Sequence, residues 1–156
     1  MAAAIIGCDP IIVLEPHEAR RALALELGAH RALDPADTPV LPTGMDHVLD
    51  TTGRPALLEQ GLVSLGRRGT LGLVAASPQG TRLAIGPNDL VSHGQRIIGI
   101  IEGDSNPQIF IPQLIAHYRA GRLPFDRMIR RYPLSDINTA IDDQHAGRVV
   151  KAVLIP

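Results

Sequence analysis

A carboxylate at the end of a buried strand is the feature of this sequence with the clearest chemical meaning. Residues 11–14 form a continuous apolar run, typical of a parallel strand buried on both faces, and Glu15 follows directly. In a dinucleotide-binding fold, a carboxylate in this place accepts hydrogen bonds from the ribose hydroxyls and repels a 2′-phosphate, which favours NAD over NADP. A surface Glu15 paired with Arg20 is the alternative that spacing alone leaves open.

The other half of such a site is a glycine-rich turn that binds the pyrophosphate. In the G-x-G-x-x-G pattern this turn lies about 20 residues before the carboxylate. Only nine residues precede Pro10, where the strand region opens. We therefore expect the first strand and its glycine-rich turn to be missing, so that the dinucleotide site is half present.

Three later strands are expected to end in small or polar residues, at residues 51–53, 74–76 and 100–103. In parallel sheets, ligands bind at the carboxyl ends of the strands. Small residues there allow the backbone and a cofactor to approach closely. The alternative is that these residues only form turns.

The sequence contains no motif of a catalytic centre. Six histidines are scattered without an H-E-x-x-H pattern, and the single Cys8 has no partner for a cysteine metal site. Neither G-x-S-x-G nor G-x-x-x-x-G-K-[ST] occurs. We therefore predict no catalytic residue and no metal ligand in this chain.

Composition indicates a globular protein and argues against two classes of partner. The 156 residues are 45% hydrophobic and 20% charged, with a net charge of −1. The chain has no basic patch and only 3% aromatic residues, which argues against nucleic acid and an anionic membrane surface. No apolar run reaches the roughly 20 residues of a membrane span. A lone cysteine suits a reducing compartment, so we expect a cytoplasmic location.

Short β-branched runs alternate with helical patterns, which predicts an α/β fold with a parallel sheet. Pro16 suits the first position of a helix that ends before Gly28, and Ser135 is expected to cap the last helix. No domain boundary stands out, so residues 1–156 are taken as one partial dinucleotide-binding domain. Helices are expected at 1–6, 16–27, 54–65, 107–120 and 136–146, and strands at 11–14, 31–33, 46–50, 69–76, 97–101, 128–132 and 149–155.

Several stretches carry a family resemblance in their order and spacing. They include I-I-V-L-E at 11–15, E-L-G-A at 26–29, D-T-T-G at 50–53, G-I-I-E-G-D-S at 99–105 and G-R-V-V-K at 147–151. Over residues 1–156 the chain resembles the C-terminal coenzyme domain of zinc-dependent medium-chain alcohol dehydrogenases, nearest to the aryl- or benzyl-alcohol branch. The resemblance implies a Rossmann-like doubly wound parallel sheet that lacks its first strand and glycine-rich turn.

The same resemblance implies which residues contact NAD. Glu15 stands where Asp is more usual. Lys151 stands where many relatives have Arg, so the chain offers a point charge there in place of the bidentate fork of an arginine. The implied cofactor-binding residues are Glu15 and Arg20 (ribose), Thr51 and Thr52 (adenine side), Val74, Ala76, Ile100 and Glu102 (nicotinamide pocket) and Lys151 (pyrophosphate).

The resemblance also implies what this chain lacks. In the family, the catalytic zinc is held in an N-terminal domain, where it polarises the alcohol oxygen so that hydride can leave to NAD. We therefore expect the chain to be inactive alone, with Met1 an internal methionine of a longer frame. The missing strand is central in the order 3-2-1-4-5-6, so its loss would leave two open edges and favour a homo-oligomer through a sheet edge.

Three functional interpretations follow. The first is the coenzyme-binding portion of an NAD-dependent zinc alcohol dehydrogenase that oxidises aromatic or similar primary alcohols to aldehydes. The second is a non-catalytic remnant or oligomerisation module that binds no NAD. The third is a zinc-free relative similar to quinone reductases, against which Glu15 argues because those relatives usually prefer NADP.

Overall fold

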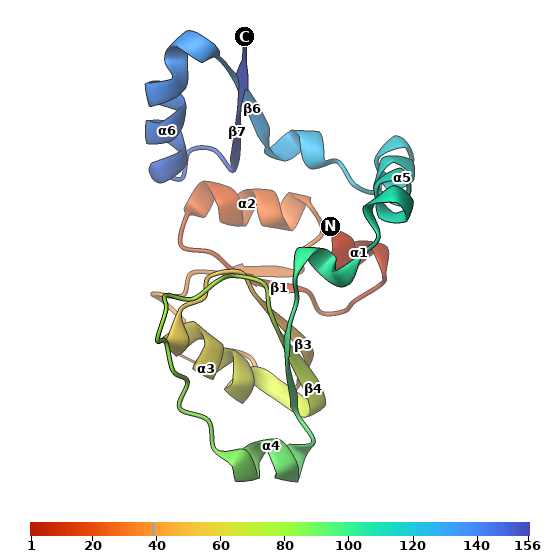
Figure 1. Cartoon of the computed structure of the whole chain (residues 1–156), viewed down its shortest axis with the longest axis vertical. Coiled ribbons are helices and arrows are strands. Elements are labelled where there is room, and N and C mark those ends of the chain that lie inside the picture. Colours follow the sequence, from red (N-terminus) through yellow and green to blue (C-terminus); the bar gives the residue numbers. More distant parts are fainter. Residues whose placement is uncertain (39) are drawn as a thin grey trace. The chain divides into compact units, whose positions relative to one another are not determined.

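The computed structural model describes residues 1–38 and 40–156 (Figure 1). The chain divides into two compact units, one formed by Met1–Pro39 with Pro107–Pro156 and the other by Val40–Asn106. The sequence pattern did not indicate this division. The second boundary between the units, after Asn106, coincides with the start of a helix and carries no linker composition. Each unit is described by itself below.

The first unit contains two short parallel sheets with helices beside them. In one sheet β1 pairs with β2, with Val13 opposite Ala32, and in the other β6 pairs with β7, with Arg131 opposite Val153. Figure 1 shows α6 alongside β6 and β7. The elements are α1 (Ala2–Ile5), β1 (Ile12–Leu14), α2 (Glu18–Glu26), β2 (Arg31–Leu33), α5 (Pro107–Arg119), η2 (Phe125–Met128), β6 (Ile129–Pro133), η3 (Leu134–Asp136), α6 (Ile137–His145) and β7 (Lys151–Ile155).

The second unit is a three-stranded parallel sheet in the order β3-β4-β5. Gly72 of the central strand pairs with Leu49 on one side and with Ile98 on the other. The elements are β3 (Met45–Asp50), α3 (Pro55–Ser64), β4 (Leu65–Leu73), α4 (Pro87–His93), β5 (Arg96–Gly99) and η1 (Glu102–Asp104).

The core of the second unit forms where α3 packs against the sheet. Leu71, in the central strand, is 0% exposed and packs in a cluster with Leu58 and Leu62 of α3. Gly61 permits this close packing, because a Cβ there would meet Val48 at 3.2 Å and Leu71 at 3.3 Å. A larger residue in this helical position would push the helix away from the strands.

The other face of this sheet carries apolar side chains that remain exposed. Leu49 is 62% exposed and Ile98 is 46% exposed, and Gly72 separates them in the central strand. Residues next to each other along a strand face opposite sides. Within the second unit, therefore, α3 covers the Leu71 face, and the face bearing Leu49 and Ile98 is largely open.

A second buried cluster holds the β6-β7 sheet and α6 together. Tyr132, Ala140 and Val149 form its apolar part. Inside it, the Tyr132 hydroxyl donates to Asp143 Oδ2 at 2.6 Å, and Arg148 Nε donates to Asp143 Oδ1 at 2.7 Å. Arg130 adds an ion pair with Asp143 at 3.5 Å and lies over the Tyr132 ring. Both oxygens of the buried Asp143 carboxylate thus have partners, which offsets the cost of burying a charge.

The predicted helices and strands all occur in the expected order, with small differences at the boundaries, whereas α4 and the three 3₁₀ turns were not predicted as elements. The strand predicted at 69–76 begins earlier, at Leu65, and the helix predicted from Pro16 begins at Glu18, so Pro16 lies outside it. Ser135 does not cap α6, because the N-cap is Asp136 and the Ser135 hydroxyl donates to the Asp136 carboxylate. Ser135 instead lies within the 3₁₀ turn η3, which directly precedes the helix.

The strands pair in three separate sheets. These are β1-β2, β3-β4-β5 and β6-β7. Within the part of the chain that the structure describes, only β4 has a strand on both sides. No helix among these residues is long and apolar enough to cross a membrane.

The Asp143 network predicts a specific acid sensitivity. The hydrogen bond from Tyr132, and then that from Arg148, lower the pKa of Asp143 below 3.8, whereas burial raises the pKa of Tyr132. Because the folded pKa of Asp143 is lower than the unfolded one, its stabilisation is present above about pH 4 and is lost as pH falls through the folded pKa. We expect Asp143→Asn to weaken this acid dependence in denaturant titrations from pH 7 to 3.

Asp142→Asn is the matched control, because Asp142 is the exposed neighbour on the same helix. It should keep the acid dependence of the unmodified chain. Equal pH profiles for the two variants would show that the Asp143 network does not contribute to it.

Candidate functional site

The turn after β1 holds the predicted ribose-binding carboxylate. Glu15 extends the β1-β2 pairing by one bond, since its N–H donates to the Leu33 carbonyl at 3.1 Å. Its Oε1 accepts a hydrogen bond from the His17 N–H at 2.9 Å. The side chain is half-buried, and its position is fixed by the backbone that leads into α2. A carboxylate has about four acceptor sites, so this bond leaves others for a ligand.

Arg21, which the sequence analysis did not single out, fixes this same turn. One guanidinium nitrogen, NH1, donates to the Glu15 carbonyl at 2.8 Å, the Pro16 carbonyl at 2.8 Å and Asp34 Oδ2 at 2.7 Å. Asp34 directly follows β2, so Arg21 joins the carboxyl ends of both paired strands. An acidic residue after each of two adjacent strands, with an arginine in the helix between them, is the sequence signal that could have found it.

Arg20 does not pair with Glu15 among the described residues, which argues against the surface ion pair considered above. Its NH2 donates instead to the carbonyls of Val149 at 2.9 Å and Gln144 at 3.3 Å. Gly147 lies against the same end of α2, because a Cβ there would fall 2.7 Å or less from the His17 ring. The α6–β7 turn therefore engages one nitrogen of the Arg20 guanidinium group.

Lys151 opens β7, opposite Ile129 of β6, and its side chain is exposed. In the described residues it has no ion pair. Glu15, Arg20 and Lys151 all belong to the first unit, and the other six predicted cofactor residues belong to the second.

In the second unit, the turn after β3 is organised by a buried carboxylate. Asp50 is 8% exposed and accepts hydrogen bonds from the Gly53 N–H at 2.7 Å and from the Thr52 hydroxyl at 2.7 Å and N–H at 3.2 Å. An aspartate that bonds the backbone two or three residues ahead is a common way to fix a turn. Thr51 and Thr52 are thereby held at the surface, at the end of the strand.

The turns after β3 and β4 approach each other closely. The Ser77 hydroxyl donates to the Gly53 carbonyl at 2.8 Å, and a Cβ at Gly53 would lie 2.8 Å from the Ala76 carbonyl oxygen. Gly53 also has a φ of +65°, which a residue with a side chain rarely adopts. The small residues at these strand ends thus allow two backbones to meet, with Val74 and Ala76 exposed beside them.

The segment after β5 has an unusual backbone. Ile100 continues the pairing, since its N–H donates to the Leu73 carbonyl at 2.9 Å, and its side chain reaches over Gly72. Glu102 and Asp104 have φ values of 49° and 47°, on either side of Gly103 at 69°. Two non-glycine residues in the left-handed region cost free energy, of order 1–3 kcal/mol each, and such strain occurs most often at ligand sites.

The structure therefore brings together six of the nine predicted cofactor residues at one edge of one sheet. Thr51, Thr52, Val74, Ala76, Ile100 and Glu102 follow the carboxyl ends of β3, β4 and β5, which the register aligns at Asp50, Leu73 and Gly99.

A zinc site does not fit the residues of this chain. Within residues 1–38 and 40–156, no three histidine, cysteine, aspartate or glutamate side chains lie close enough together to hold a metal ion. Cys8 is a free thiol. No step that uses zinc can therefore be derived from these residues.

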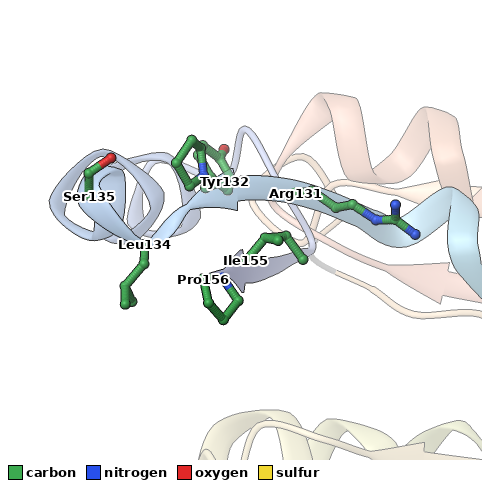
Figure 2. Close-up of a pocket in the computed structure, with 7 residues that line it drawn as sticks. Arg131, Tyr132, Leu134, Ser135, Ile155 and Pro156 are labelled. Atoms are coloured by element: carbon green, nitrogen blue, oxygen red, sulfur yellow. The ribbon is translucent and has the colours of Figure 1, made fainter.

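A hollow of about 570 Å³ is lined by none of the predicted cofactor residues (Figure 2). It is at the carboxyl ends of β6 and β7 and is mostly apolar, and its lining includes Leu134, Ile155 and Pro156. Figure 2 shows these three side chains around the end of the β7 arrow. The hollow contains no cluster of reactive groups, so we do not assign the site to it.

Comparison with known proteins gives the family. Residues 1–117 match the zinc-binding dehydrogenase family. The chain is 39% identical to a geraniol dehydrogenase from Castellaniella defragrans, over 99% of this chain and 44% of that protein. It thus spans less than half the length of this relative.

Solved structures agree with the sequence match. Benzyl alcohol dehydrogenase from Acinetobacter calcoaceticus superposes with a TM-score of 0.92 at 34% identity, over 98% of this chain and 44% of that one. A zinc-binding dehydrogenase from Sinorhizobium meliloti, crystallised with NADP, superposes with a TM-score of 0.84 at 27% identity, over 99% of this chain and 47% of that one. These matches confirm the Rossmann-like α/β fold and the predicted resemblance. The chain belongs to the family of zinc-binding alcohol dehydrogenases, in which it represents a coenzyme-binding type of domain.

Proposed function

We propose that this chain is the NAD-binding portion of an alcohol dehydrogenase, and that it binds the adenosine half of NAD at the carboxyl ends of its parallel strands. The observation that carries this proposal is the Glu15 carboxylate at the end of β1, held by the His17 N–H and by a turn that Arg21 fixes. A carboxylate held in this way is ready to accept bonds from two neighbouring hydroxyl groups.

The choice of NAD over NADP also depends on Glu15. A 2′-phosphate would bring a second negative charge beside this carboxylate, whereas a free 2′-hydroxyl donates to it. The Sinorhizobium meliloti protein was crystallised with NADP. For this chain we expect the negative charge of Glu15 to favour NAD over NADP. On this proposal Thr51 and Thr52 lie on the adenine side.

The remaining contacts are proposals of the same kind. Val74, Ala76, Ile100 and Glu102 would line the nicotinamide pocket. Lys151 would supply a positive charge to the pyrophosphate, for which it is suited because it is exposed and has no ion pair among the described residues. Arg20 would lie beside the ribose with the part of its guanidinium group that does not bond the α6–β7 turn.

The substrate that we propose is a primary alcohol with an aromatic or similarly apolar group. This rests on the geraniol and benzyl alcohol dehydrogenases among the relatives. When bound in a full-length dehydrogenase, zinc polarises the alcohol oxygen. Because the described residues do not provide a zinc site, we expect no alcohol oxidation by this chain alone. The cytoplasm is the location that we propose, since the free thiol of Cys8 suits a reducing compartment.

Glu15→Gln tests the proposed function. We expect about tenfold weaker NAD binding by calorimetry, because a charge-assisted hydrogen bond contributes about 1.5–3 kcal/mol. The discrimination against NADP should decrease at the same time. Glu18→Gln, an exposed carboxylate at the start of α2, should bind NAD as the unmodified chain does. Equal affinities of the two variants would contradict the role of Glu15.

Arg21→Gln tests whether the turn positions the carboxylate. The change leaves Asp34 and two carbonyls without their donor, and Arg21 and Asp34 are both only 21% exposed. We expect the free energy of unfolding to fall by about 1–3 kcal/mol and NAD affinity to fall with it. Arg31→Gln, an exposed arginine on β2, is the control and should change neither quantity. Loss of stability with unchanged NAD affinity would limit Arg21 to a structural role.

A second function is favoured by the open strand edges. β1 and β3 each pair with one strand only among the described residues, and an unpaired edge can hydrogen-bond with another chain. The alternative proposal is therefore an oligomerisation module, with two copies joined through a sheet edge. Leu49 lies on β3 and is 62% exposed, which suits contact with a second copy.

Leu49→Lys tests the alternative. A charge on an edge strand disfavours edge-to-edge pairing, so we expect the sedimentation profile to shift towards the monomer. Val63→Lys changes a 75% exposed valine on α3, away from any edge, and should leave the profile unchanged. A chain that is monomeric before either change would rule out this function.

A further inference from the structure

A small pocket in the first unit is lined by an unusual number of arginines. It has a volume of about 150 Å³ and lies where α2, the start of β6 and the α6–β7 turn meet. Its charged lining consists of Arg20, Arg127, Arg130 and Arg148, and the rest of the lining is apolar or glycine. No acidic residue is among the lining residues. The pocket is thus strongly cationic for its size.

One buried donor of this pocket lacks an acceptor. Arg20 Nε is shielded from solvent and has no hydrogen-bond partner among the described residues, although NH2 of the same guanidinium group bonds two carbonyls. Leaving a buried donor unpaired is costly, and most such donors in proteins have a partner. Nε itself is closed off from the pocket, so Arg20 would act on a ligand there through the charge of its guanidinium group and not through this N–H.

Nearby carboxylates do not neutralise the pocket. Arg127 pairs with Glu26, and Arg130 and Arg148 share Asp143. Two carboxylates therefore face three guanidinium groups, and Arg20 adds a fourth that has no carboxylate partner among the described residues. The side chains of Arg127, Arg130 and Arg148 are 43%, 60% and 57% exposed, so a ligand can reach them.

We propose that this pocket binds a single tetrahedral oxyanion, the phosphoryl group of inorganic phosphate or of a phosphate monoester. Arginine is the residue best suited to this task, because its planar fork matches phosphate oxygens and its charge strengthens each bond. A pocket of about 150 Å³ is larger than the space that one water molecule needs, so it can admit an ion of phosphate size.

Glu15 does not line this pocket, and every lining residue belongs to the first unit. The pocket contains none of the nine predicted cofactor residues except Arg20. Phosphate binding can therefore be measured in the absence of NAD, and Glu15→Gln should leave it unchanged. Failure of the NAD proposal would not affect this one.

The test is a titration of the full chain with inorganic phosphate, with sodium chloride used to hold the ionic strength constant. We expect saturable binding by calorimetry and a rise in the unfolding temperature beyond that produced by chloride. Arg127→Gln and Arg130→Gln each remove one exposed guanidinium group from the pocket and should weaken phosphate about tenfold. Arg122→Gln, an exposed arginine outside the pocket, should bind phosphate as the unmodified chain does.

Ribose 5-phosphate distinguishes the two sources of the group. Similar affinity for this ester and for phosphate would assign the pocket to esters, whereas binding of phosphate alone would assign it to the free ion. The proposal is overturned if phosphate has no saturable effect beyond that of chloride. It is also overturned if both pocket variants, shown to be folded by circular dichroism, bind phosphate as Arg122→Gln does.

Discussion

The parallel hydrogen bonding of β4 to both β3 and β5 is the constraint on which the candidate site of the second unit depends. Parallel pairing gives all three strands the same direction, so their carboxyl ends finish at one edge, next to Asp50, Leu73 and Gly99. The pairing continues for one residue beyond the sheet, through the N–H groups of Val74 and Ile100. Without that alignment, the six predicted cofactor residues would be unrelated surface residues.

Charged side chains then fix the turns that follow the strands. Asp50 accepts three bonds from the turn after β3, and Arg21 donates to two carbonyls and a carboxylate around the turn after β1. Both groups are mostly withdrawn from solvent, where a hydrogen bond to a charged group is stronger than at the surface. The turns after β1 and β3 are therefore each fixed by several hydrogen bonds to one charged side chain.

Local patterns allowed most of the elements to be predicted from the sequence. The continuous apolar run before Glu15 identified β1, and glycines with positive φ marked the ends of α2 and α6, at Gly28 and Gly147. The residues around the three strand ends were also predicted, because their type and order match a known family. The family itself is confirmed by the comparisons.

What could not be predicted depends on contacts between residues far apart in the sequence. The bonds of Arg20 to Gln144 and Val149 span more than 120 residues, and no local pattern shows them. Arg21 was missed because an arginine in a helix usually points to solvent, and only the folded turn brings it to Asp34. The boundary of α6 was displaced because a 3₁₀ turn and a helix start have similar sequence requirements at Ser135.

The division into two units has a consequence for the order of folding. The second unit is one continuous segment with its own leucine cluster, whereas the first is made of two segments with all of the second unit between them. Joining the ends of a long flexible segment costs entropy, and a segment that has already folded holds its ends at a fixed separation. The second unit can thus form from local contacts alone, and its formation lowers the entropic barrier to assembly of the first.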